Sequence, residues 1–406
     1  MTTMTGNGRP LRVLMMKGEM GWPRVNGHDV HCFHMMKALS ELGHEVGLLT
    51  AKSPVPEAIQ GVPLSFVGRF TEDGAPADAR LPERMTWLQE RYRSYYGAEA
   101  GLLAQVRQAV SLFAADAVVV GGLNLLPYFS VMRDVVSVWY AADELALHHL
   151  TQVQLRSPET WSHVREALVE GLYERAYAPL MDRAWVVSDS ERRAMRGLAG
   201  VRAVDVLPNG VDGELFQPST RTPHPRSAVF WGRLDFGPNV QALQWFCSEV
   251  WPIIRRRVPD AQFTIVGFHP IGSVTELASR DGIVLRANLA DLRDEVSSHA
   301  VVVLPFVSGG GIKNKLLEAA AMAQPIVCTP RAAEGLRGLE AMPIRIERGA
   351  DALAQAVMTL WESPQAAREL GERARRWVLA NHSWNAVGAA AADILQNAVA
   401  ERERVA

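Results

Sequence analysis

The feature that most constrains this chain is a repeated alternation of short apolar runs with longer amphipathic stretches. In the first part of the chain, the runs expected to form strands are residues 11–16, 45–50, 117–120, 135–140 and 183–187. Between the first two runs, apolar residues recur at helical spacing at Val30, Phe33, Met36 and Leu39. Strands separated by helices pair in parallel, because each right-handed crossover places a helix on one face of the sheet. The pattern therefore predicts a doubly wound α/β domain.

The same alternation begins again after a proline-rich segment. Residues 217–226 read QPSTRTPHPR and contain no large apolar side chain, which is typical of an exposed linker. Beyond the linker, the runs expected to form strands are residues 228–231, 262–266, 283–285, 300–304 and 325–328. We therefore predict two doubly wound, Rossmann-like α/β domains in tandem, residues 1–218 and 219–382, followed by a last segment, residues 383–406.

Composition narrows the classes of partner. The chain has 406 residues, and its 42 basic and 44 acidic residues give a net charge of −2, so it lacks the positive field that nucleic-acid binding needs. Its three cysteines, Cys32, Cys247 and Cys328, form no CxxC pair, which favours a reducing compartment. The first residues are polar and unlike a signal peptide, and no run approaches the ~18 apolar residues of a membrane span. We expect a cytoplasmic protein that does not bind nucleic acid.

The segment that indicates chemistry is residues 301–323. An expected buried strand leads into three glycines at 309–311, which let a ligand approach the backbone, and the helix that follows points unpaired N–H groups at the same place. Lys315 and Glu318 lie three residues apart and share a face of that helix. The ammonium suits a phosphate and the carboxylate suits the two hydroxyls of a ribose, so the segment predicts a nucleotide site. A solvated ion pair is the alternative explanation of this Lys–Glu spacing.

A second signal follows the strand expected at 228–231. Gly232 and Arg233 come directly after it, and an arginine at the end of a strand can clamp a diphosphate with its guanidinium fork. An ordinary surface arginine explains the position without a ligand.

In their order along the chain, these motifs resemble those of the retaining, nucleotide-sugar-dependent GT-B glycosyltransferases called family four. The resemblance spans nearly the whole chain, and its C-terminal part is most similar to the branch that reads GGG-x-x-x-K-x-x-E-A-x-A. The motifs that carry it are the glycine-rich loop after the first strand, Leu42-Gly43-His44-Glu45-Val46, Pro208-Asn209-Gly210-Val211-Asp212, Gly232-Arg233-Leu234, Pro259-Asp260-Ala261, Val266-Gly267 and the segment from Gly311 to Pro325. It implies a GT-B fold of two Rossmann-like domains, with a C-terminal helix, here near 384–397, that crosses back to the N-terminal domain.

The resemblance also implies roles for residues of the second domain. Arg233 and Lys315 are expected to hold the donor diphosphate as catalytic residues, and Glu318 is expected to bind the ribose hydroxyls. The remaining donor-binding residues are Gly232, Gly309, Gly310 and Gly311. No metal and no cofactor is implied, because arginine, lysine and the helix dipole neutralise the leaving diphosphate; the nucleotide-diphosphate-sugar is a co-substrate.

The chain departs from the family pattern at three positions. Gly310 stands eight positions before Glu318, where the family often has a carboxylate that contacts the donor sugar. Ala142 stands where a histidine commonly precedes the aspartate, here Asp143, which we expect to contact the acceptor or the donor as a catalytic residue. Gln324 replaces the usual glycine before the last expected strand.

The loop over residues 18–29 lies where the family binds its acceptor. The resemblance makes Asn26, Gly27 and His28 the expected acceptor-binding residues. A capping turn with Asn26 or Asp29 as N-cap explains the same residues equally well. The acceptor is expected to be a glycan, a lipid-linked carrier or a small metabolite.

Two weaker patterns have ordinary explanations. His28, His31 and His34 recur every three residues, but zinc needs a complete ligand set, so we expect a partly exposed helix face and no metal site. Residues 87–96 mix aromatic with basic side chains, which suits peripheral membrane contact or stacking on an acceptor sugar. Nearby glutamates favour packing between domains for this stretch.

The resemblance implies a hexosyltransferase-like enzyme. It would move a sugar from a nucleotide-diphosphate-sugar to an acceptor hydroxyl, with retention of configuration and without a metal. Two alternatives stay open because of Gly310 and Ala142. They are a nucleotide-sugar epimerase of the same architecture and a degenerate GT-B subunit that binds or scaffolds.

Overall fold

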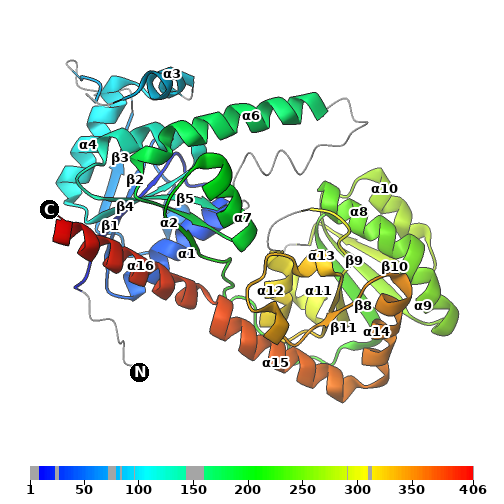
Figure 1. Ribbon diagram of the computed structural model, residues 1–406. Coiled ribbons are helices and arrows are strands. Elements are labelled where there is room, and N and C mark those ends of the chain that lie inside the picture. Colours follow the sequence, from blue (N-terminus) through cyan, green and yellow to red (C-terminus); the bar gives the residue numbers. More distant parts are fainter. Residues whose placement is uncertain are drawn as a thin grey trace. The chain divides into compact units, whose positions relative to one another are not determined.

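The computed structural model describes residues 9–22, 27–71, 79–82, 85–95, 97–142, 160–289, 291–309 and 313–405. The chain forms two compact units, of which the first is Met1–Pro208 with Trp384–Ala406 and the second is Asn209–Ser383. Each unit is built around one parallel β-sheet with helices on its faces (Figure 1). In the described ranges, no helix combines the length and the apolar character needed to cross a bilayer.

The first unit contains a seven-stranded sheet in the order β3-β2-β1-β4-β5-β6-β7. Its strands are β1 (Arg12–Lys17), β2 (Glu45–Thr50), β3 (Phe66–Arg69), β4 (Ala117–Gly121), β5 (Val136–Ala142), β6 (Arg183–Val186) and β7 (Val204–Val206). Its helices are α1 (Gly27–Glu41), α2 (Pro56–Ile59), α3 (Trp87–Tyr95), α4 (Ala100–Phe113), α6 (Thr160–Tyr177), α7 (Asp189–Ala194) and α16 (Trp384–Val405). All neighbouring strands are parallel, and the strand order reverses between β1 and β4. This is the doubly wound arrangement that the sequence predicts.

Side chains that alternate along β1 build a core on each face of this sheet. Leu14 and Met16 belong to a buried cluster shared with α4 and α6. Val13 and Met15 belong to a second cluster, shared with α1 and α16. The expected return of the last helix is therefore confirmed, because α16 covers one face of the first sheet (Figure 1).

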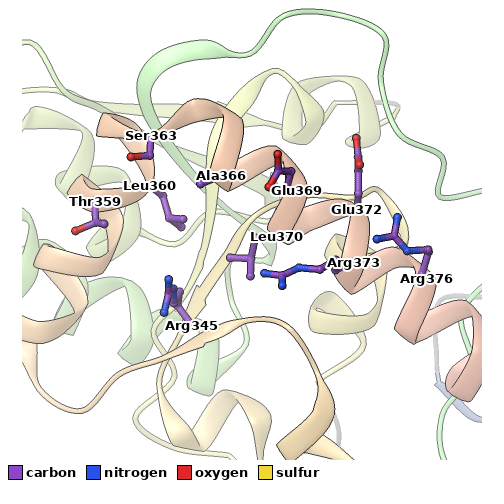
Figure 2. A pocket seen from close by; sticks show the side chains of 10 residues that line it. All are labelled: Arg345, Thr359, Leu360, Ser363, Ala366, Glu369, Leu370, Glu372, Arg373 and Arg376. Carbon is purple, nitrogen blue, oxygen red and sulfur yellow. The ribbon is translucent and has the colours of Figure 1, made fainter.

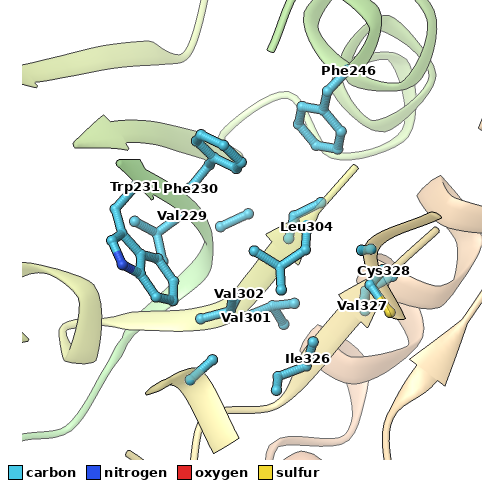
Figure 3. Packing of buried hydrophobic residues seen from close by; sticks show 14 of the residues in the cluster. Val229, Phe230, Trp231, Phe246, Val301, Val302, Leu304, Ile326, Val327 and Cys328 are labelled. Atoms are coloured by element: carbon cyan, nitrogen blue, oxygen red, sulfur yellow. The ribbon is translucent and has the colours of Figure 1, made fainter. Parts of the chain in front are cut away.

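The second unit contains a six-stranded parallel sheet in the order β10-β9-β8-β11-β12-β13, which reverses between β8 and β11. Its strands are β8 (His224–Arg233), β9 (Gln262–Phe268), β10 (Ile283–Ala287), β11 (His299–Leu304), β12 (Ile326–Cys328) and β13 (Arg345–Ile346). Its helices are α8 (Gly237–Trp245), α9 (Trp251–Arg257), α10 (Gly272–Thr275), α11 (Arg293–Ser297), α12 (Asn314–Ala321), α13 (Pro330–Ala333), α14 (Ala350–Glu362) and α15 (Pro364–His382). Val229, Val302 and Leu304 pack in its core with Phe246 (Figure 3).

The boundary between the units lies after Pro208 rather than at the expected position 218. The backbone N–H of Val211 donates to the carbonyl of His382 at 2.7 Å, and the Val211 side chain lies in the core of the second unit. These contacts tie the start of the second unit to its last helix. The proline-rich segment therefore lies within the second unit, and its final residues from His224 onward begin β8.

Candidate functional site

The candidate site lies at the carboxyl end of the second sheet, where the strand order reverses. β8 ends in Gly232 and Arg233, and β11 beside it leads through a loop into α12, which carries Lys315 and Glu318. Ligands of open α/β sheets bind at this reversal. Gly310 and Gly311 lie outside the described residues.

The ammonium of Lys315 lies between two aromatic rings and one amide. Its Nζ is 5.9 Å from the ring centroids of both Phe230 and Phe306, and 3.4 Å from Oδ1 of Asn239. Burial lowers the pKa of Lys315, and the charge of Glu318 raises it in part. In the described part of the chain, no carboxylate lies within ion-pair distance of this ammonium. The solvated Lys–Glu ion pair considered for this spacing is therefore not formed, and the polar contact of the ammonium is with Asn239.

Glu318 lies one turn further along α12 and is held by the end of β8. The indole Nε1 of Trp231 donates a hydrogen bond to Oε2 of Glu318 at 3.2 Å. Burial raises the pKa of Glu318, while the Lys315 charge and the Trp231 hydrogen bond lower it in part. The carboxylate is thus fixed at one oxygen, and it is half-buried next to the cation.

Gly232 is needed between these groups for steric reasons. Its φ of +144° lies in the region that favours glycine, and a Cβ at this position would lie 2.5 Å from Cε of Lys315. Gly309 has a φ of +86°, and a Cβ there would lie 3.0 Å from Cβ of Pro238. Both glycines therefore allow β8, α8 and the loop before α12 to approach one another closely.

The Arg233 side chain is bound to a neighbour in its own loop. Its Nε and Nη2 donate to the two carboxylate oxygens of Asp235 at 3.1 and 2.8 Å. This pairing lowers the pKa of Asp235 and raises that of Arg233. The structure brings Lys315, Glu318 and Gly232 together and places the guanidinium of Arg233 on Asp235.

Two further residues contact this site, Trp231 and Asn239, and neither was predicted from the sequence. Asn239 is only 2% exposed, and its Nδ2 donates to the backbone carbonyl of Arg233 at 2.7 Å. A polar residue directly after Pro238, in the first turn of α8, was a signal for Asn239. Trp231 reads as a core residue in the strand pattern, and no local signal distinguishes it.

The Pro208-Asn209-Gly210 motif also reaches α12. Nδ2 of Asn209 donates to Oδ1 of Asn314, the first residue of α12, at 2.6 Å. The carbonyl of Asn209 accepts from Nδ1 of His382 at 3.2 Å. The motif therefore links the first turn of α12 to the end of α15.

In the first unit, Gly27 and His28 begin α1, whereas Asn26 and Asp143 lie outside the described residues. Nε2 of His28 lies 3.1 Å from the carbonyl of Tyr140 at the end of β5, and a carbonyl only accepts, so Nε2 carries the proton. Burial lowers the pKa of His28. A Cβ on Gly121 would lie 2.8 Å from this ring.

Asp29 does not cap α1, in contrast to one of the two expected explanations. It is the third residue of the helix, and its carboxylate forms a buried ion pair with Lys17 at the end of β1. An N-cap residue precedes the helical conformation and accepts from the first turn, so the position excludes this role.

Histidines on α1 pack against α16. The expectation that these histidines form a partly exposed helix face is wrong for His31. His31 is buried, its Nδ1 lies 2.6 Å from the hydroxyl of Tyr140, and burial lowers its pKa to about 3. His34 stacks on Trp384, the first residue of α16, with ring centroids 4.8 Å apart. In the ranges that the structure describes, no three His, Cys, Asp or Glu side chains gather in a way that could hold a metal.

A surface pocket of about 390 Å³ lies elsewhere in the second unit, on α14, α15 and β13 (Figure 2). Arg345, Arg373 and Leu370 are among its lining residues. None of the residues at the strand reversal lines it, so this pocket is separate from the candidate site.

Comparisons with known proteins agree with the fold. The chain is 27% identical over 120 residues to an uncharacterized 44.6 kDa protein in the cps region of Klebsiella pneumoniae, over 28% of this chain and 31% of that protein. The chain therefore matches less than a third of that curated relative's length. Sucrose-phosphate synthase from Thermosynechococcus elongatus is 15% identical, with 96% of this chain and 100% of that chain covered and a TM-score of 0.66. HepE of Anabaena in complex with UDP and glucose is 14% identical, with 95% and 99% covered and a TM-score of 0.60.

Two family models match the two units in turn. Residues 25–215 match the model described as Glycosyltransferase Family 4, and residues 225–363 match the model described as Glycosyl transferases group 1. The two matches together cover most of the chain. The chain therefore belongs to the group 1, family-four glycosyltransferases and has their GT-B fold of two Rossmann-like units.

Proposed function

We propose that this protein transfers a hexosyl group from a nucleoside-diphosphate sugar to an acceptor hydroxyl, with retention of configuration and without a metal ion. The observation that carries the proposal is the position of Lys315 and Glu318 on one face of α12, beside the end of β8. HepE, which shares the fold, was solved with UDP and glucose, and these are the parts of a donor of this class.

In this proposal the donor supplies the anion that Lys315 lacks. A diphosphate beside the Lys315 ammonium compensates for burial of the charge, so that binding favours its protonated form. Glu318 accepts hydrogen bonds from the ribose hydroxyls with the oxygen that Trp231 leaves available. Arg233 moves from Asp235 to the diphosphate, which is feasible because an exposed ion pair is weak. The amides of Gly309, Gly310 and Gly311 complete this donor site.

The chemical step follows from this placement. The acceptor hydroxyl attacks the anomeric carbon on the face from which the diphosphate leaves. The bond from that carbon to the β-phosphate oxygen breaks as the glycosidic bond forms, and the acceptor proton passes to the departing phosphate. Lys315, Arg233 and the N-terminus of α12 neutralise the charge on the leaving group, and this is our reason for proposing that no metal or other cofactor is needed.

We place the acceptor on the first unit, at Asn26, Gly27 and His28, and we propose that Asp143 contacts the acceptor or the donor as a catalytic residue. His28 supports this part of the proposal because the Tyr140 carbonyl fixes its ring with Nε2 protonated. Nδ1 is then a hydrogen-bond acceptor, which suits a sugar or carrier hydroxyl. A glycan, a lipid-linked carrier and a small metabolite all offer such a hydroxyl.

We also propose that the protein makes peripheral contact with an anionic membrane surface. The solvent-facing stripe of α6 consists of Trp161, Arg165, Leu168, Leu172 and Arg175. Its apolar side chains are unusually exposed to solvent, since Trp161 is 80% exposed and Leu168 is 63% exposed. The glutamates of α6 at positions 166, 170 and 174 are half-buried or buried and so lie off this stripe. A stripe of large apolar and basic residues suits the interface of an anionic bilayer.

Helix α3 extends the same surface. Tyr92 of α3 packs against Tyr173 of α6 with ring centroids 5.6 Å apart, so the two helices are neighbours. Trp87 and Tyr95 of α3 are 71% and 61% exposed, and the guanidinium of Arg91 lies 5.8 Å from the Trp87 ring. Aromatic side chains of this kind are common at membrane interfaces.

Sedimentation with vesicles tests the membrane contact. We expect the protein to sediment with vesicles that contain phosphatidylglycerol and to stay in solution with phosphatidylcholine alone. The double variant Trp161→Ser/Leu168→Ser should lose the binding, whereas Leu112→Ser, which changes a leucine on α4 that is also 71% exposed, should keep it. Equal sedimentation of both variants would contradict this contact.

We also propose a cytoplasmic location for the protein. It is supported by the cysteines, since Cys32, Cys247 and Cys328 are all buried and free. Cell fractionation with the untagged protein tests it.

The transfer itself is tested with labelled nucleotide sugars in the presence and absence of acceptors. A transferase consumes the donor when an acceptor is present, and NMR of the product should show the anomeric configuration of the donor. Activity should survive EDTA. Conversion of a nucleotide sugar alone would show an epimerase instead, and nucleotide binding without turnover on broad acceptor panels would show a binding subunit.

A further inference from the structure

We propose that Asn239 is a positioning residue that holds the Lys315 ammonium in place at the donor site. The inference rests on the proposed function, because it assigns a task to a residue that supports the donor-binding lysine. It is drawn from the contacts of the Asn239 amide, from its burial and from the space that Gly232 leaves at the end of β8.

The first contact fixes the orientation of the amide. Nδ2 of Asn239 donates to the carbonyl of Arg233 at 2.7 Å, and a carbonyl can only accept. Oδ1 must therefore face the other way, toward Nζ of Lys315 at 3.4 Å. An ammonium can only donate, so each half of the amide meets the partner that it requires.

The second observation is burial. Asn239 is 2% exposed, and its own N–H donates to the carbonyl of Phe236 at 2.9 Å in the first turn of α8. A buried amide with both ends engaged is held rigidly, because turning it would leave polar atoms without partners. The residue therefore presents Oδ1 to Lys315 before any ligand is bound.

The third observation is the space left by Gly232. A Cβ on Gly232 would lie 2.8 Å from Nζ of Lys315 and 3.0 Å from Nδ2 of Asn239. The glycine thus lets the lysine and the asparagine come together at the end of β8. Residues 232, 239 and 315 therefore pack against one another as one cluster.

The other charged and aromatic groups around the ammonium do not replace Oδ1. Glu318 on α12 is the acid whose charge raises the pKa of Lys315, and its carboxylate accepts a hydrogen bond from Trp231. Lys313, in the loop before α12, donates to the carbonyl of Gly309 at 3.1 Å. Arg233 at the end of β8 pairs with Asp235. Among the described residues, Oδ1 of Asn239 is the polar atom within hydrogen-bond distance of Nζ.

Two substitutions of Asn239 should move the protonation of Lys315 in opposite directions. Asn239→Leu keeps the size of the side chain but removes the acceptor, so Lys315 should lose its proton at a lower pH. Asn239→Asp places a carboxylate beside Nζ, so Lys315 should keep its proton to a pH higher by about 1–3 units. A residue that only supported the fold would not produce opposite shifts.

Competitive labelling measures the pH at which Lys315 loses its proton, and it needs no ligand. Acetic anhydride reacts with unprotonated amines, and mass spectrometry of the Lys315 peptide over a pH series gives the midpoint for each variant. Lys52, whose side chain is 73% exposed, provides the internal reference. Gln244→Leu, at an exposed amide on α8, is the matched control and should leave the Lys315 midpoint unchanged.

Titration of each variant with UDP over the same pH range gives the functional readout. We expect the alkaline limit of UDP binding to fall in Asn239→Leu and to rise in Asn239→Asp, each by the amount seen in labelling. Labelling midpoints equal to that of the wild type would overturn the inference, and the Asp variant alone decides if the Leu variant does not fold. If the wild type binds no nucleotide, the proposed function fails, while the labelling midpoints still decide the role of Asn239.

Discussion

Replacing Gly232 with alanine distinguishes an effect on the stability of the fold from an effect on binding at the donor site. The φ of +144° favours glycine, so alanine should cost about 1–3 kcal/mol of the free energy of unfolding. Its Cβ would lie 2.5 Å from Cε and 2.8 Å from Nζ of Lys315. These atoms are the end of a flexible side chain, so we expect Lys315 to move rather than the sheet to break. The displaced ammonium can no longer reach the diphosphate.

A hydrogen bond to a charged group contributes about 1.5–3 kcal/mol, so Gly232→Ala should weaken UDP binding by roughly 10- to 150-fold. Calorimetric titration measures the affinity, and chemical denaturation measures the stability. Gly349→Ala is the matched control, because Gly349 has a φ of +83° in the same unit but no atom within 4 Å of its Cβ position. The control should lose similar stability and keep its affinity. Wild-type affinity in Gly232→Ala, or equal weakening in both variants, would refute the reasoning.

Four further substitutions test other parts of the account. Lys315→Ala should weaken UDP binding by about 1–3 kcal/mol, and unchanged calorimetric affinity would rule out its assignment. Glu318→Gln cannot titrate, so the wild type should lose stability relative to this variant as the pH rises from the ordinary glutamate value of 4.5 through the raised pKa of Glu318. Parallel curves of thermal stability against pH would contradict that shift. Asp235→Asn should strengthen UDP binding because it releases Arg233, and weaker binding in the same titration would argue against a phosphate role for that arginine. Trp384→Ala should lower the free energy of unfolding by about 3–5 kcal/mol, since Trp384, the first residue of α16, is 6% exposed and packs in the cluster shared with α1; denaturation with a loss under about 1 kcal/mol would disagree.

The interior of both sheets could be predicted from the sequence because central parallel strands are apolar on both faces. β4 and β11 show this, since nearly every side chain in them is buried. The edge strands β3 and β13 were not predicted. β3 alternates half-buried and exposed residues, and β13 has two exposed residues, so neither forms an apolar run. Their positions depend on tertiary pairing rather than on a local pattern.

The candidate site also has a part that could be predicted from the sequence and a part that could not. Lys315 and Glu318 were predictable because they lie three residues apart on one helix, after a glycine-rich loop. Their partners were not, because the hydrogen bond from Lys315 to Asn239 joins positions 76 residues apart and that from Trp231 to Glu318 joins positions 87 residues apart. Such contacts depend on the strand order, which brings the ends of β8 and β11 together.

The most direct test of the central claim is a crystal structure of the protein with UDP, the nucleotide found with HepE. We predict that the diphosphate lies within hydrogen-bond distance of Nζ of Lys315 and that the ribose hydroxyls donate to the carboxylate of Glu318. A nucleotide bound elsewhere, for example in the pocket beside Arg345, with Lys315 and Glu318 touching only protein atoms, would contradict the account.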